Sequence, residues 1–176
     1  MMYSTHVIFA WLLTVLGFKT NSLDISLNLD IIYAFVAVTF GSLLPDIDHP
    51  RSLISKSYWF SISKFISKTT RHRGWTHSLF GAILFTSIGA IFLQGNLFIL
   101  TTFFLGYTSH LLIDTLNPSG VSWLWPKKKK YKIGIIKTGS RAEDVFRTVL
   151  LILLVLVFLD LFSTFKATFS VSNPKS

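Results

Sequence analysis

The chain has 176 residues, of which 51% are hydrophobic and 14% are charged, and its mean hydropathy is +0.55. Soluble domains carry roughly 25% charged residues, so this composition disfavours a soluble helical bundle and favours a membrane protein. Seventeen Lys and Arg oppose eight Asp and Glu, an excess that in a membrane protein reflects orientation and anionic headgroups, so no nucleic-acid partner is expected. The lack of cysteine excludes disulfides and thiolate sites, and leaves histidine and carboxylate as the ligands of any metal.

Five apolar segments predict membrane-embedded helices, in chain order residues 6–18, 30–44, 78–93, 97–113 and 145–162. A bilayer core about 30 Å thick needs roughly 20 helical residues, so the shorter segments should tilt or thin the bilayer locally. The expected fold is all-α, a polytopic membrane helical bundle with about five membrane-embedded helices. A single domain should cover residues 1–166 and a flexible tail residues 167–176, and the first helix is expected to be retained because it lacks the marks of a cleaved signal.

The basic residues of the loops predict which way the bundle faces. Threading the five segments puts the N-terminus and the loops 45–77 and 114–144 on one side of the membrane. These loops carry most of the Lys and Arg, including the lysine run at 127–130. Cytoplasmic loops are enriched in Lys and Arg, so this side is expected in the cytoplasm, with the lysine run anchored on anionic lipid.

The same threading brings all five histidines of the chain to the cytoplasmic membrane level, together with several acids. The candidate metal ligands are His6, Asp46, Asp48, His49, His72, His77, His110 and Asp114. Mixed imidazole and carboxylate ligands suit Zn²⁺, and they also suit Mn²⁺ or Fe²⁺. Eight candidates exceed what one tetrahedral ion needs, so the sequence predicts one or two divalent ions.

Local spacing supports part of this set. His110 and Asp114 are four residues apart, which places both on one face of a helix, one turn apart. In "PDIDHP" (45–50) the residue before each proline is pushed towards extended geometry, which would turn Asp46 and Asp48 to the same side. Two adjacent carboxylates repel each other unless a cation lies between them.

Simpler interpretations exist for several of these residues. A single histidine at a membrane interface, such as His6, often only exposes its polar ring to the headgroups, and His49 could simply turn the chain before Pro50. His110 and Asp114 could form a buried hydrogen-bonded pair without a metal. Ionisable groups at membrane depth are costly, however, and usually mark function.

A second set of residues could hold a phosphate. These candidates are Arg71, Arg73, Gly139, Ser140 and Arg141. The arginines could bind phosphate in a bidentate manner or anchor headgroups. Ser140 could act as an N-cap with Glu143 in a capping box, or the amides at this helix start could bind the phosphate.

Taken in order, the motifs resemble those of the bacterial inner-membrane metal-dependent hydrolases known as YdjM-like proteins. The matching pieces are His6, "GSLLPDIDHPRS" (41–52), "HRGWTHS" (72–78), "GYTSHLLIDTLNPSG" (106–120) and "KTGSRAEDVFR" (137–147). The resemblance implies a multi-pass bacterial inner-membrane protein with hydrolase activity. More distantly, "HLLID" (110–114) is similar to the metal-binding helix of zinc-dependent phospholipases C. The chain departs from them because no second histidine follows Asp114, and Glu143 is the later acid that could substitute.

These observations lead to a hypothesis of phosphoester hydrolysis on a phospholipid-type substrate at the cytoplasmic membrane surface. Asp46, His77, His110 and Asp114 would bind the first ion, and His6, His49 and His72 would bind a second ion or orient the first. The catalytic candidates are Asp48 as a general base or further ligand, Arg73 and Glu143. Two alternatives are a metal transporter, with ligands near the bilayer midplane, and a structural or regulatory membrane protein with a folding metal. The sequence does not fix the oligomeric state.

Overall fold

All the named secondary-structure elements in the described part of the chain are helices. The computed structural model describes residues 1–20, 28–49, 52, 74–92 and 95–172. Its elements are α1 (Tyr3–Lys19), α2 (Asn28–Leu43), η1 (Leu44–Asp48), η2 (Trp75–His77), α4 (Leu79–Phe92), α5 (Leu97–Thr115) and α6 (Arg141–Ser172). The two η elements are short 3₁₀ helices. Each predicted apolar segment coincides with one α-helix, so the all-α prediction is confirmed.

Three stretches in the described residues are long and apolar enough to cross a membrane. They are Ile31–Asp48, Leu97–Thr115 and Arg141–Thr164. α1 has 17 residues and α4 has 14, both fewer than the roughly 20 that an upright crossing needs. Both helices are nevertheless packed against the longer ones, as the prediction of a bundle with about five apolar helices requires.

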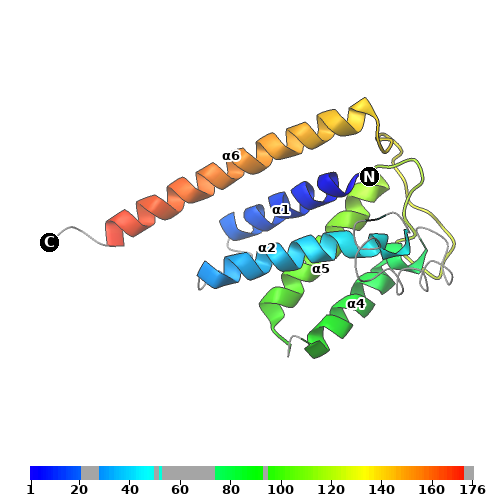
Figure 1. The fold of residues 1–176 in the computed structure, drawn as a ribbon, viewed down its shortest axis with the longest axis horizontal. Helices are drawn as coiled ribbons and strands as arrows, with labels where there is room; N and C mark the ends of the chain where they lie inside the picture. Colours follow the sequence, from blue (N-terminus) through cyan, green and yellow to red (C-terminus); the bar gives the residue numbers. More distant parts are fainter. Residues whose placement is uncertain (21–27, 50–51, 53–73, 93–94, 173–176) are drawn as a thin grey trace.

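α5 lies at the centre of the bundle, where it packs against α1, α2 and α4 (Figure 1). α6 packs along α1 and extends past the other helices, so the C-terminus lies far from the end where the N-terminus and η1 are found (Figure 1). The last turns of α6 reach Ser172, inside the segment 167–176 that the sequence set apart as a tail.

α6 is connected to α1 near both ends of their contact. Near its first turn, the buried Glu143 accepts hydrogen bonds from the amide of Met2 (2.6 Å) and the hydroxyl of Thr5 (3.1 Å). Near the other end, Lys19 of α1 forms an ion pair with Asp160 of α6. An otherwise apolar helix pair therefore has polar contacts that fix its register.

The closest backbone approach in the bundle is made by glycines. A Cβ atom on Gly41 of α2 would clash with the carbonyl of Phe103, and one on Gly106 of α5 would clash with the carbonyl of Val38. In membranes, where lipid tails are as apolar as side chains, small residues of this kind let helices associate through close packing. The glycine pair therefore fixes how α2 crosses α5.

Gly106→Ala should destabilise the protein, because the added methyl group forces α2 and α5 apart. Overpacking of this kind costs about 1–3 kcal/mol. Thermal unfolding in detergent, followed by circular dichroism, should show a lower Tm. Gly89→Ala is the matched control, since its Cβ would meet only a side-chain carbon of Leu100 at an ordinary 3.6 Å. An equal Tm for both variants would show that the crossing tolerates the methyl group.

Candidate metal centre

Imidazoles and carboxylates from four separate elements meet at one end of the bundle. α1 supplies His6, η1 supplies Asp46 and Asp48, η2 supplies His77, and α5 supplies His110 and Asp114. All of these except Asp46 are buried, and the Asp46 side chain is 22% exposed. The structure thus brings together six of the eight predicted ligands.

Four of their atoms face one another at the spacing of metal ligands. The Nε2 atoms of His77 and His110 are 3.3 Å apart. His77 Nε2 lies 3.4 Å from Asp46 Oδ1 and 3.8 Å from Asp114 Oδ2, while His110 Nε2 lies 3.8 Å from each of these oxygens. A tetrahedral Zn²⁺ with bonds of about 2.0–2.1 Å would hold its ligand atoms about 3.3–3.4 Å apart. Five of the distances within this set therefore lie within about half an ångström of the tetrahedral spacing.

The orientation of His110 follows from the crossing of α2 and α5. Its Nδ1 lies 2.7 Å from the carbonyl oxygen of Ser42. A carbonyl can only accept, so Nδ1 carries the hydrogen and donates it. In the neutral ring Nε2 then has a lone pair directed at the cluster, which is the arrangement found in metal-binding histidines.

Asp48 orients the ring of His77 from the side of Nδ1, opposite the nitrogen that faces Asp46. Asp48 Oδ2 lies 3.5 Å from Nδ1 of His77 and accepts a 2.9 Å hydrogen bond from the hydroxyl of Thr76. The hydroxyl of Tyr107 donates to the carbonyl of Thr76 at 2.5 Å, which ties this turn to α5. Asp48 belongs to neither candidate metal group. Its position matches a carboxylate that orients a ligating histidine.

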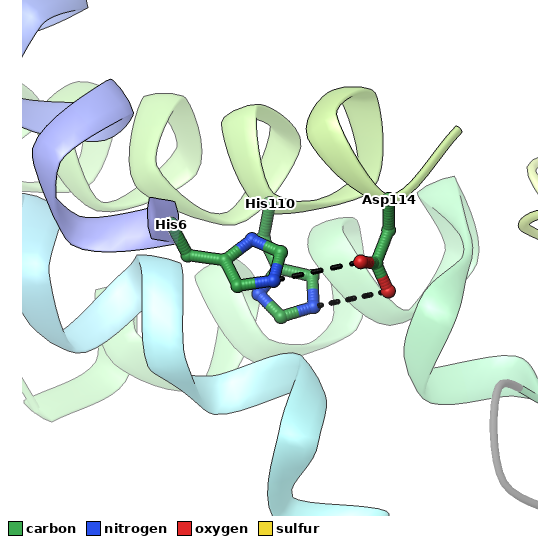
Figure 2. A group of neighbouring side chains, drawn as sticks. All are labelled: His6, His110 and Asp114. Atoms are coloured by element: carbon green, nitrogen blue, oxygen red, sulfur yellow. Dashed lines mark ion pairs between the residues drawn. The ribbon is translucent and has the colours of Figure 1, made fainter. Parts of the chain in front are cut away.

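His6 extends the cluster on the α1 side (Figure 2). Its ring stacks on that of His110 with centroids 3.8 Å apart, and its Nε2 lies 3.5 Å from Asp114 Oδ1. Within the described residues, both ring nitrogens of this buried side chain lack a hydrogen-bond partner. Burying an unsatisfied polar group is costly, so a further ligand or ion is expected here.

The contacts define two overlapping groups. Asp46, His77 and His110 form one, and His6, His110 and Asp114 form the other, with the ligand atoms of each group within 4.8 Å of one another. Asp114 directs Oδ1 towards His6 and Oδ2 towards His77 and His110. A carboxylate placed in this way could bridge two ions, one in each group.

The charges of the cluster favour the binding of a cation. Asp46, Asp48 and Asp114 are three carboxylates close together, and buried carboxylates are stable only when paired. The amino nitrogen of Met1 lies 2.7 Å from Asp114 Oδ1. Burial lowers the pKa of His77, but its hydrogen bonds with Asp46 and Asp48 outweigh this effect and raise the pKa to about 9. A proton on His77 thus supplies part of the positive charge that a metal ion would bring.

The "PDIDHP" segment is not extended as predicted. Residues 44–48 form the 3₁₀ helix η1, and only His49, at its C-cap before Pro50, is extended (φ −100°, ψ 117°). Pro45 explains this, because it has no N–H to continue the hydrogen bonds of α2. The chain therefore forms a tighter 3₁₀ turn instead of an extended segment. Asp46 and Asp48 consequently contact opposite nitrogens of His77.

Two of the predicted ligands are not in the cluster as described. His49 is half-buried and belongs to neither candidate metal group. His72 lies outside the described residues, as do Arg71 and Arg73. Their predicted roles stay predictions.

At the start of α6 the predicted N-cap forms, and the phosphate-binding role of this helix start stays a prediction. Ser140 accepts a hydrogen bond from the Glu143 amide at 3.3 Å, while the Glu143 side chain accepts from the Gly139 amide at 2.7 Å. The Ser140 amide donates to the Lys137 carbonyl at 3.1 Å. Neither amide is available to a phosphate in this structure, because both are used within the chain. Arg141 is exposed.

The buried Glu143 therefore connects elements rather than facing the cluster. Sequence reasoning missed Ser42, Thr76 and Tyr107, which orient the ligands. Ser42 accepts from His110 through its backbone carbonyl, and Tyr107 donates to the backbone carbonyl of Thr76. Contacts to backbone carbonyls give no sequence signal. The position of Thr76 beside His77 was a usable clue, since hydroxyls often support buried carboxylates.

Comparisons with known proteins give one family and no solved structure. The sequence profile of a family described as YdjM inner membrane protein matches residues 1–169. Inner membrane protein YdjM of Escherichia coli (strain K12) is 37% identical over 107 residues, covering 57% of this chain and 54% of that protein, and the Shigella flexneri protein of the same name gives the same figures. Uncharacterized protein YvsG of Bacillus subtilis (strain 168) is 30% identical over 106 residues, covering 60% of this chain and 65% of YvsG.

The chain thus spans less than two thirds of the length of these curated relatives. No solved structure matches it.

His110→Ala should abolish metal binding, because both candidate groups share this imidazole. The affinity should fall by more than the roughly 10–100-fold that changes outside the ligand shell cost. Metal per chain, measured by inductively coupled plasma mass spectrometry on purified protein, tests this, and added Zn²⁺ should raise the Tm of the unsubstituted protein only.

His49→Ala is the matched control and should keep its metal. Retention of metal in His110→Ala would contradict the site, and loss in both variants would place His49 among the ligands.

Proposed function

Because this chain belongs to the YdjM inner membrane protein family, we propose that it is a membrane-bound metal-dependent hydrolase. It cleaves a phosphoester of a phospholipid-type substrate at the cytoplasmic surface of the bacterial inner membrane, which it crosses several times. The observation that carries this proposal is the cluster of imidazole nitrogens and carboxylate oxygens at one end of an apolar bundle, which forms two overlapping groups of possible metal ligands.

The level of the cluster supports a surface reaction. Asp46 is near the end of the span Ile31–Asp48, and Asp114 is near the end of the span Leu97–Thr115. His6 is in the first turn of α1, at the same end of the bundle. A transporter would place its ligands near the bilayer midplane, so the position favours an enzyme that reaches lipid headgroups.

The charges of the described loops support a cytoplasmic orientation. The loop that follows α5 at the cluster end carries the exposed lysine run 127–130, whereas the opposite end of α1 carries only Lys19. By the positive-inside rule the cluster faces the cytoplasm. The same lysines would attract the anionic headgroups of that leaflet.

The surrounding residues fit hydrolysis. When bound, a divalent ion polarises a phosphoryl oxygen and lowers the pKa of its water to near neutrality. Nε2 of His110 holds its lone pair towards the ion position, Nε2 of His77 would bind the ion once it gives up its proton, and Asp48 lies beside the other nitrogen of His77. Asp46 is the one member of the cluster with an exposed edge, so substrate reaches the cluster there. Distant similarity to zinc-dependent phospholipases C supports phosphoester chemistry.

In this proposal Arg141, with Arg71 and Arg73, neutralises the phosphate. Asp48 or Glu143 could transfer a proton to or from the substrate only if its carboxylate is not already held by other groups. Asp48 contacts His77, and the carboxylate of Glu143 is held by Met2, Thr5 and Gly139. The geometry therefore favours positioning roles for both acids.

Removal of metal should abolish turnover. Purified protein in lipid nanodiscs, treated with a chelator and then with Zn²⁺ or Mn²⁺, should release phosphorylated headgroup from phospholipid only after metal is restored. His110→Ala should remain inactive at every metal concentration. Bound metal without turnover across phospholipid, nucleotide and nucleic-acid substrates would favour a structural or regulatory role for the ion instead.

The substitution Asp48→Asn distinguishes a role of Asp48 in positioning His77 from a role as general base. If Asp48 orients His77, the substitution lowers metal affinity by roughly 10–100-fold, and turnover recovers at saturating metal. If Asp48 is the base, turnover stays low even when metal content is full. Asp144→Asn removes an exposed carboxylate that pairs with Arg147 on α6, and it should change neither quantity.

A further inference from the structure

An apolar groove lies on the bundle surface where α1 and α2 meet. Its volume is 520 Å³, and it is lined by Trp11 of α1 and by residues of α2 from Ile31 to Leu43. Ile32, Val36 and Phe40 recur every four residues along its length, and all three are exposed. The groove therefore runs along α2, next to α1.

The polar groups in the groove wall are already paired with each other. The indole nitrogen of Trp11 donates to the hydroxyl of Thr39 at 2.7 Å, and that hydroxyl donates to the carbonyl of Phe35 at 2.6 Å. The ring of Phe35 packs edge-on against Trp11 with centroids 5.5 Å apart. The wall thus presents carbon to any occupant, which suits a hydrocarbon chain and not a polar ligand.

One end of the groove lies at the end of α2 that leads into η1. Leu43 is the last residue of α2, and η1 begins at Leu44 and carries Asp46, the exposed member of the cluster. From Ile31 to Leu43 α2 rises about 18 Å, close to the roughly 15 Å of one leaflet of a 30 Å hydrocarbon core. A lipid with its phosphate near Asp46 would have a chain of matching length along α2.

We propose that this groove binds an acyl chain of the phospholipid whose phosphate reaches the metal cluster. The inference rests on the proposed hydrolase function and specifies its substrate as a membrane diacyl lipid. The groove holds the chain in place and so aligns the headgroup with the ligand set, which lowers the entropic cost of bringing phosphate and ion together.

A photoreactive phospholipid with a diazirine in one acyl chain tests the groove directly. Metal-loaded protein in nanodiscs is irradiated in excess unreactive lipid, and labelled residues are mapped by mass spectrometry. Ile32, Val36 and Phe40 should be labelled severalfold more than the exposed apolar residues of α6, such as Ile152 and Val155. Equal labelling of α2 and α6 would overturn the proposal, because it would mean ordinary contact with surrounding lipid.

Val36→Trp fills the groove and should reduce labelling of α2 severalfold, with metal content unchanged. Val155→Trp places the same side chain on the exposed face of α6 and is the matched control. If Val36→Trp fails to fold or loses its metal, Ile32→Trp fills the same groove in its place. Unchanged labelling in a folded groove variant would also overturn the proposal.

Measurements of substrate hydrolysis distinguish a failure of the groove proposal from a failure of the proposed hydrolase function. Val36→Trp should lower hydrolysis of a long-chain diacyl phospholipid but not of a soluble short-chain phosphodiester. Loss of both activities to the same extent would contradict a role for the groove in substrate binding. Selective labelling without any turnover in the unsubstituted protein would disprove the hydrolase function and leave α2 as a lipid-binding surface.

Discussion

The close crossing of α2 and α5 is the constraint on which the rest of the structure depends. Because Gly41 and Gly106 have no side chains, the two backbones meet, and the carbonyl of Ser42 comes within 2.7 Å of His110. Helices in a membrane gain little from burying apolar surface against each other, so close packing and hydrogen bonds determine their arrangement. The same crossing aims the imidazole of His110, and Pro45 ends α2 close by, where η1 presents Asp46.

The cluster that results gathers three carboxylates and three imidazoles, a composition that could bind a cation. Asp46 and Asp48 contact the two ring nitrogens of His77, and their charge raises its pKa to about 9. Asp114 and His6 lie on the other side of His110, where the nitrogens of His6 have no hydrogen-bond partner among the described residues. Such a concentration of buried ionisable groups in an apolar bundle is costly, and its cost is understandable if the groups bind an ion with a function.

Hydrolysis and a purely structural metal would use the same ligands, but they differ in what they require of the surroundings. A structural ion is best enclosed by its four ligands, whereas a reactive ion needs an open side. The cluster has an accessible edge at Asp46 and lies at the ends of the spans, and an apolar groove runs along α2, the helix that leads into η1. These features together favour a lipid-directed reaction over a metal that only stabilises the fold.

The sequence alone determined the helices and the pairing of His110 with Asp114, because apolar length and a spacing of four residues are local properties of the chain. It also indicated that distant histidines would share one membrane level, since the order of the helices dictates this. Only the tertiary structure decided which atoms meet. In the folded protein residues 44–48 form a 3₁₀ helix, and Asp48 lies beside Nδ1 of His77. The side chain of Glu143 takes part in the contact between α1 and α6. The reason is that these outcomes depend on helix crossing and on backbone carbonyls such as that of Ser42, which no side-chain pattern records.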